Sequence, residues 1–244
     1  MRTLVTDLRD HGLLRGADGW LRRQSKRFFA SVETLWEIAF HYESRLEGAT
    51  TGHVLVHIAR FTDDAADRIH AARTGVVPPF DDVRRWPEWP GCERPGAVVI
   101  EDIIIALDRM NDEADAVTSE EWAADPAIAQ AVLDAIVEMA VHDWDLNIEI
   151  EPLPEDEARA LLRYVVDELA DAAGWPHISF ESDDTVATRL TVVDASGVTT
   201  SVSGDAEELL KWITGRAEAP KIAADGSELP ALPEWVCHRE FQSF

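Results

Sequence analysis

Apolar residues recur at three- and four-residue spacing through the first two-thirds of the chain, a pattern typical of amphipathic helices. The expected helices cover about residues 20–46, 50–74, 97–116 and 126–149. Gly48 and Gly75 are stop signals after the first two, and Thr50 or Thr51 can cap the second. Pro126 suits the first turn of the fourth helix, where its missing N–H costs nothing. Four such helices predict a helical bundle.

The apolar spacing changes after Pro154. One more helix is expected over about residues 155–173, followed by runs with a period near two over about residues 178–180, 188–193 and 198–202. Runs of this kind, separated by polar turns, indicate short antiparallel strands. Asp205 and Glu208 have the spacing of a capping box and predict a final helix that stops at Gly215. We therefore predict an α+β protein, with a helical bundle in residues 1–153 and a smaller α+β domain in residues 154–244.

A long loop rich in Trp, Pro and Gly separates the second and third expected helices, over residues 78–96. A loop of this length inside a compact domain is usually functional or disordered. Trp86 and Trp89 favour a packed loop, and they could line a pocket, although packing into the core is the commoner use of tryptophan.

Composition and charge exclude several classes of partner. Of the 244 residues, 46% are hydrophobic, which is enough for a sizeable core. The 22 Lys and Arg residues against 47 Asp and Glu residues give a net charge of −25. A surface this anionic repels phosphate backbones and anionic lipids, so we expect neither nucleic acid nor a membrane as a partner.

Cysteine content and the N-terminal segment indicate the compartment. Cys92 and Cys237 are too few for a disulfide framework, and neither belongs to a C-x-x-C pair. The N-terminal segment lacks the apolar stretch of a signal peptide, and no run approaches the roughly 18 apolar residues of a membrane span. We expect a soluble, cytoplasmic protein whose thiols are unpaired.

The fourth expected helix carries a polar stripe. Glu138 and His142 are one turn apart and Asp145 is three residues further on, so all three fall on one face. By spacing alone, the simpler interpretation is a solvated helix face, because charged stripes usually are. A carboxylate and an imidazole at this spacing can nevertheless both reach one metal ion.

The second expected helix holds His53 and His57, also one turn apart. The two could chelate a metal themselves, or one could complete a site with Glu138 and His142. His57 lies closer to the apolar face of its helix, although a core histidine bonded to a neighbour would look the same. Two histidines and one carboxylate suit zinc with an open position, and also non-haem iron, so the ligand set leaves the metal open.

Four segments of the chain, in order, carry a resemblance to a known family. They are residues 46–60 (LEGATTGHVLVHIAR), the E-x-x-x-H-x-x-D-L segment from Glu138, residues 204–216 (GDAEELLKWITGR) and residues 229–235 (LPALPEW). Together they resemble the mycothiol-dependent maleylpyruvate isomerase-like proteins, which are DinB-like metalloenzymes with an N-terminal four-helix bundle. Ala49 departs from the pattern, since the family has tryptophan there.

The resemblance implies a set of site residues and two cofactors. The metal ligands would be His57, Glu138 and His142, the catalytic acidic residue would be Asp145, and the arginine of the second domain would be Arg216. Arg216 could hold a carboxylate of the substrate or the thiol, although a cation at a helix C-terminus is also favourable without any ligand. The implied cofactors are a divalent metal, usually zinc, and the low-molecular-weight thiol mycothiol.

Three functions follow as expectations. The first is cis–trans isomerisation of a small electrophile of the maleylpyruvate type, in which mycothiol adds to the double bond and is eliminated after rotation. The second is a mycothiol S-transferase of detoxification or natural-product biosynthesis, an alternative that the Ala49 departure keeps open. The third is a non-catalytic binding module on the same fold, against which the intact set of candidate residues argues.

Overall fold

The computed structural model describes residues 11–16, 19–78, 92–146, 148, 150–169, 176–183, 188–194, 196–217, 223–224, 229 and 232. The chain divides into two compact units, Met1–Ile150 and Glu151–Phe244. The expectations for Trp86, Trp89 and Cys237 lie outside the described residues. Among the helices that the structure describes, none combines the length and apolar character needed to span a bilayer.

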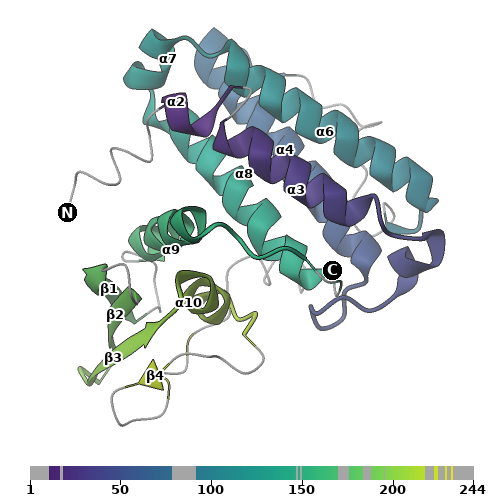
Figure 1. Cartoon of the computed structure of the whole chain (residues 1–244). Coiled ribbons are helices and arrows are strands. Elements are labelled where there is room, and N and C mark those ends of the chain that lie inside the picture. Colours follow the sequence, from purple (N-terminus) through teal and green to yellow (C-terminus); the bar gives the residue numbers. More distant parts are fainter. Residues whose placement is uncertain are drawn as a thin grey trace. The chain divides into compact units, whose positions relative to one another are not determined.

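The first unit is helical (Figure 1). Its elements are α2 (His11–Leu14), α3 (Trp20–Val32), the 3-10 helix η1 (Glu37–His41), α4 (Thr51–Thr74), α6 (Gly96–Ala116), α7 (Ser119–Ala124) and α8 (Pro126–Asp145). The helix α4 packs against both α6 and α8, and α3 packs against α8. Large apolar side chains fill the core between them, including Phe28, Leu55, Ile58, Ile103 and Ile136. The four long helices predicted from apolar spacing are the ones that enclose this core.

Local signals place the ends of α4 and the start of α8 where the sequence predicted them. The Thr50 side chain accepts a hydrogen bond from the His53 amide and caps α4, which ends at Gly75 in the left-handed conformation (φ 71°). Asp125 caps α8 by accepting from the Ala127 amide, with proline at the first helical position.

Two helix ends and one additional helix differ from expectation. The helix expected to reach residue 46 ends at Val32, because the Thr34 hydroxyl donates to the Ser31 carbonyl (2.8 Å) and the chain then turns into η1. Trp36, which continues the apolar spacing of this helix, is 80% exposed as a result. The helix α8 stops at Asp145 rather than near residue 149, and α7 was not expected at all.

The short helix α7 starts with a capping box. Thr118 accepts from the Glu121 amide, and the Glu121 carboxylate accepts from the Thr118 amide (2.7 Å). The hydrogen bond from the Thr118 backbone amide is the largest cause that lowers the pKa of Glu121 below its ordinary value, and the hydrogen bond with the Thr118 hydroxyl is the second. Glu121 therefore stabilises the fold in its ionised form, and this contribution is lost as pH falls through the lowered pKa.

We expect Glu121→Gln to remove this pH dependence. Glutamine can keep the hydrogen bond of the capping box but cannot ionise, so the loss of stability relative to wild type should be largest near neutral pH. Urea unfolding at several pH values between 7 and 3 measures the difference, which should shrink as the wild-type carboxylate becomes protonated. A difference that stays constant across this range would contradict the assignment.

A row of ion pairs joins α4 to α6 and to the segment before α6. The Asp102 carboxylate on α6 pairs with both Arg60 of α4 and Arg94, the latter at 2.5 Å. Asp63 of α4 pairs with Arg60 (3.5 Å) and with Arg109 of α6 (3.1 Å). These side chains are mostly shielded from solvent, so the pairs are of the kind that is costly to break.

The second unit is an antiparallel sheet with two helices (Figure 1). Its elements are α9 (Glu155–Leu169), β1 (His177–Asp183), β2 (Thr188–Val193), β3 (Thr199–Gly204), α10 (Ala206–Ile213) and β4 (Ala223–Ala224), with strand order β1-β2-β3-β4. Alternate residues of the strands are buried, among them Ile178, Leu190, Val192 and Val202. With the helical first unit, this sheet confirms the predicted α+β fold class.

Candidate metal centre

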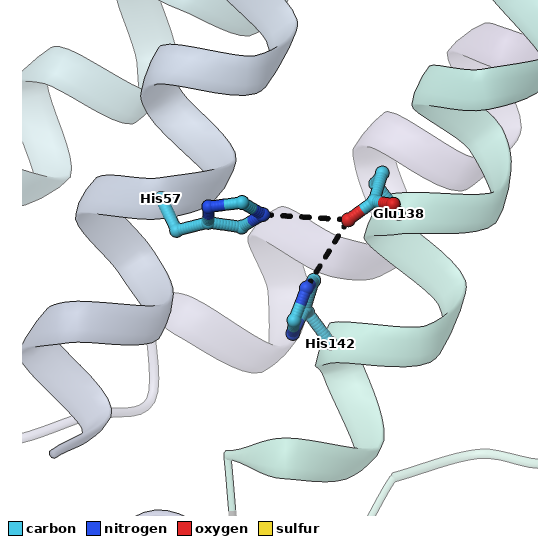
Figure 2. Close-up of side chains that lie close together, drawn as sticks. All are labelled: His57, Glu138 and His142. Atoms are coloured by element: carbon cyan, nitrogen blue, oxygen red, sulfur yellow. Dashed lines mark hydrogen bonds and ion pairs between the residues drawn. The ribbon is translucent and has the colours of Figure 1, made fainter. Parts of the chain in front are cut away.

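Three buried side chains of the first unit converge on one point. His57 comes from α4, and Glu138 and His142 come from consecutive turns of α8 (Figure 2). One potential ligand atom of each lies within 4.8 Å of the others. The Glu138 Oε2 atom is 3.4 Å from His57 Nε2 and 3.1 Å from His142 Nε2. The three residues are 2%, 6% and 0% exposed.

The burial of this stripe corrects the interpretation of it as a solvated helix face. Glu138, His142 and Asp145 are all buried, because α8 is apolar on nearly every other side and lies inside the bundle against α3 and α4. A helix that is hydrophobic all round has no solvated face. Polar groups on such a helix must find partners inside the protein.

Asp145 fixes the orientation of one candidate ligand. Its Oδ2 atom lies 2.7 Å from His142 Nδ1, and both side chains are fully buried. An ionised carboxylate can only accept a hydrogen bond, so His142 donates from Nδ1. Neutral His142 then presents the lone pair of Nε2 toward Glu138, which is the orientation seen in carboxylate–histidine–metal arrangements.

The electrostatics of the set favour a cation at its centre. Burial alone would raise the pKa of Glu138, but interactions with the imidazoles of His142 and His57 hold that pKa well below its usual range. Glu138 is therefore a carboxylate, and it faces imidazole nitrogens that can act as electron-pair donors. A carboxylate and imidazole nitrogens this close together need either protons or a metal ion between them. Two nitrogen donors and one oxygen donor suit a divalent metal that keeps an open coordination position. The residues thus fit the predicted metal.

His53, the other histidine considered as a ligand, contacts Thr50 and Cys92 instead of Glu138 and His142. Its Nδ1 atom accepts from the Thr50 amide (3.1 Å), and its Nε2 atom lies 3.2 Å from Cys92 Sγ. Burial, followed by the negative charge of Glu93, raises the pKa of the Cys92 thiol. Cys92 is therefore held as a thiol rather than as a thiolate nucleophile.

Arg216 belongs to the second unit. It follows α10, is 7% exposed, and donates from Nη1 to the Thr214 carbonyl (2.6 Å). Its own amide bonds the Lys211 carbonyl (2.7 Å) beside Gly215, which adopts the left-handed conformation (φ 76°). The chain therefore fixes this guanidinium at the C-terminal end of a helix, where a cation is favoured.

Taken together, the fold and the site define an α+β protein whose helical bundle carries a buried His–Glu–His set. No family model matches the sequence, and no curated protein matches it.

Two solved structures share the fold. One is the crystal structure of the mycothiol-dependent maleylpyruvate isomerase, at 17% identity and a TM-score of 0.68, and the other is a histidine-to-alanine mutant of that enzyme, at 17% identity and a TM-score of 0.67. In each case the match covers 88% of this chain and 94% of the other. The likeness confirms the resemblance predicted from the sequence motifs at the level of the fold.

Proposed function

We propose that this protein is a divalent-metal-dependent enzyme that uses mycothiol as a nucleophile on a small electrophilic substrate, by cis–trans isomerisation of the maleylpyruvate type. The observation that carries the proposal is the convergence of His57, Glu138 and His142 inside the fold of a mycothiol-dependent isomerase. His57 and His142 supply nitrogen donors and Glu138 a carboxylate, an arrangement suited to zinc.

The chemistry divides between the metal and the chain. His57, Glu138 and His142 would hold a divalent metal, which when bound would supply deprotonation of a coordinating thiol to the nucleophilic thiolate. Asp145 keeps the Nδ1 proton of His142 in place and so keeps Nε2 available as a donor. The raised pKa of Cys92 argues against this thiol as the nucleophile and supports an added thiol as the source of the reactive sulfur. Arg216 pairs with a carboxylate of the substrate or the thiol.

The direct test is incubation of the metal-loaded protein with mycothiol and maleylpyruvate. Formation of fumarylpyruvate with no net consumption of thiol would support the isomerase. A stable thioether adduct would favour the S-transferase instead. A protein that binds no metal and changes neither compound would contradict both, and would favour a binding module.

One observation favours the S-transferase as a second candidate. Ala49 is 4% exposed and immediately precedes the residue that caps α4, at the position where the isomerase-like family has tryptophan. A methyl group in place of an indole changes the shape of the protein near the start of the helix that carries His57. A different electrophile is the simplest consequence, and a panel of epoxides and activated alkenes with mycothiol tests it.

We expect Asp145→Asn to weaken metal binding by roughly 10- to 100-fold, as for other residues that orient a ligand histidine. An amide can present its N–H group to His142 Nδ1 and so favour the wrong tautomer. Competition with a chelator of known affinity measures the change. Metal affinity equal to wild type in a folded variant would remove Asp145 from the site.

Arg216→Ala should raise the dissociation constant of the anionic ligand while leaving metal content unchanged. Loss of a charge-assisted hydrogen bond corresponds to roughly 1.5–3 kcal/mol. Calorimetric titration with substrate, and with mycothiol alone, would show which of the two ligands Arg216 binds. Unchanged affinity for both would leave Arg216 with only its role at the end of α10.

A further inference from the structure

The imidazole of His53 connects two segments that flank the start of α4. On one side, Nδ1 lies 3.1 Å from the Thr50 amide nitrogen and 2.8 Å from the Thr50 hydroxyl oxygen. On the other side, Nε2 lies 3.2 Å from Cys92 Sγ, just before α6. His53 is 7% exposed and Cys92 is 6% exposed, so both contacts are shielded from water.

The Thr50 amide decides which ring nitrogen of His53 carries the proton. A main-chain N–H can only donate, so Nδ1 must accept and cannot be protonated. The neutral ring therefore carries its proton on Nε2 and donates it to the Cys92 sulfur. A metal at Nε2 would need the proton at Nδ1, facing the Thr50 amide. His53 is thus a hydrogen-bonding residue and not an alternative metal ligand.

The backbone of the first turn of α4 is closely packed at Gly52. A Cβ atom added at Gly52 would lie 3.0 Å from the Phe40 carbonyl oxygen and 3.2 Å from the Cys92 carbonyl oxygen. The turn is therefore confined by η1 on one side and by the segment before α6 on the other. His57 lies four residues, or about one turn, after His53, so any displacement of this turn moves His57 relative to Glu138 on α8.

We infer that His53 is a positioning residue, which holds the first turn of α4 in the place where His57 can meet Glu138 and His142. The inference rests on the proposed metal site. It assigns to the His53–Cys92 contact a role in aligning that site, although neither residue belongs to the ligand set.

Two matched pairs of variants test the inference. His53→Leu removes both ring contacts, whereas His53→Gln can still accept from the Thr50 amide, as glutamine does at this position of a capping box. Cys92→Ala removes the acceptor for Nε2–H, whereas Cys92→Ser replaces it with a hydroxyl oxygen. The two readouts are the visible spectrum and affinity of bound Co²⁺, and amide hydrogen exchange over residues 51–57 of the metal-free full-length protein.

His53→Leu should bind Co²⁺ about tenfold more weakly, with a shifted spectrum and faster exchange over residues 51–57. Cys92→Ala should shift both readouts in the same direction. His53→Gln and Cys92→Ser should give Co²⁺ affinity, spectra and exchange rates close to those of the wild type. Should His53→Leu fail to fold, the cysteine pair decides alone. Wild-type spectra and exchange rates in both Cys92→Ala and a folded His53→Leu would overturn the inference. If wild type binds no Co²⁺, the proposed metal site fails, and the exchange rates still decide whether His53 holds the turn.

Discussion

Replacing His57 with alanine is expected to abolish stoichiometric metal binding while leaving the bundle folded. One of three protein donors is lost, and the Nε2–Glu138 contact of 3.4 Å goes with it. Removal of a ligand should cost more than the roughly 10- to 100-fold in affinity lost when an outer partner is removed. Metal analysis of the purified variant, with Co²⁺ titration beside it, measures the effect. The proposed thiol-dependent activity should be lost in parallel, because the thiol then returns to its mostly protonated form.

His70→Ala is the matched control for this substitution. His70 lies on the same helix, and its Nδ1 atom is 3.0 Å from Glu113 Oε1 on α6 rather than near Glu138. The control should keep its full metal content. Full metal retention in His57→Ala would mean that His57 is not a ligand, and the site as proposed would fail.

Replacing Asp102 with asparagine should destabilise the first unit by about 2–4 kcal/mol. The carboxylate pairs with both Arg60 and Arg94, and all three side chains are less than one-fifth exposed. Burial, as the largest cause, lowers the pKa of Arg60, but arginine stays charged in proteins, so the substitution leaves a shielded positive charge with one carboxylate fewer beside it. Urea unfolding in the presence of a chelator measures the loss without any contribution from metal.

Asp134→Asn provides the comparison for Asp102. Asp134 also pairs with an arginine of α4, but Arg68 is 46% exposed in that pair, and such pairs contribute about 0–1 kcal/mol. The two substitutions remove the same charge from helices of the same bundle. Equal losses of stability would show that the burial of the Asp102 pairs has no energetic consequence.

The sequence predicts those parts of the fold that depend on neighbouring residues. The start and end of α4 follow from Thr50 and Gly75, whose effects are confined to one helix turn. The early end of α3 was not predicted, because Leu35 and Trp36 continue the apolar spacing beyond it. The helix ends where the Thr34 hydroxyl donates a hydrogen bond to the Ser31 carbonyl. The capping box of Thr118 and Glu121 was visible in the sequence and would have predicted α7.

The candidate site was less accessible to sequence reasoning. Spacing along one helix shows that Glu138 and His142 share a face, but whether that face is buried depends on what packs against it. His57 is 81 residues away from Glu138 along the chain, so their contact is a property of the tertiary structure. Spacing gave His53 and His57 as candidates, the apolar face of the helix favoured His57, and the family resemblance also pointed to His57.

The division of the ligand set between α4 and α8 has a consequence for folding. A metal held by His57 on one helix and by Glu138 and His142 on the other binds only when the two helices are packed, so it stabilises the packed state alone. Thermodynamic linkage then makes the apparent stability of the bundle rise with free metal, by about 4 kcal/mol at a thousandfold excess over the dissociation constant. With a metal at this site, the melting temperature of this protein would be a measure of the metal available to it.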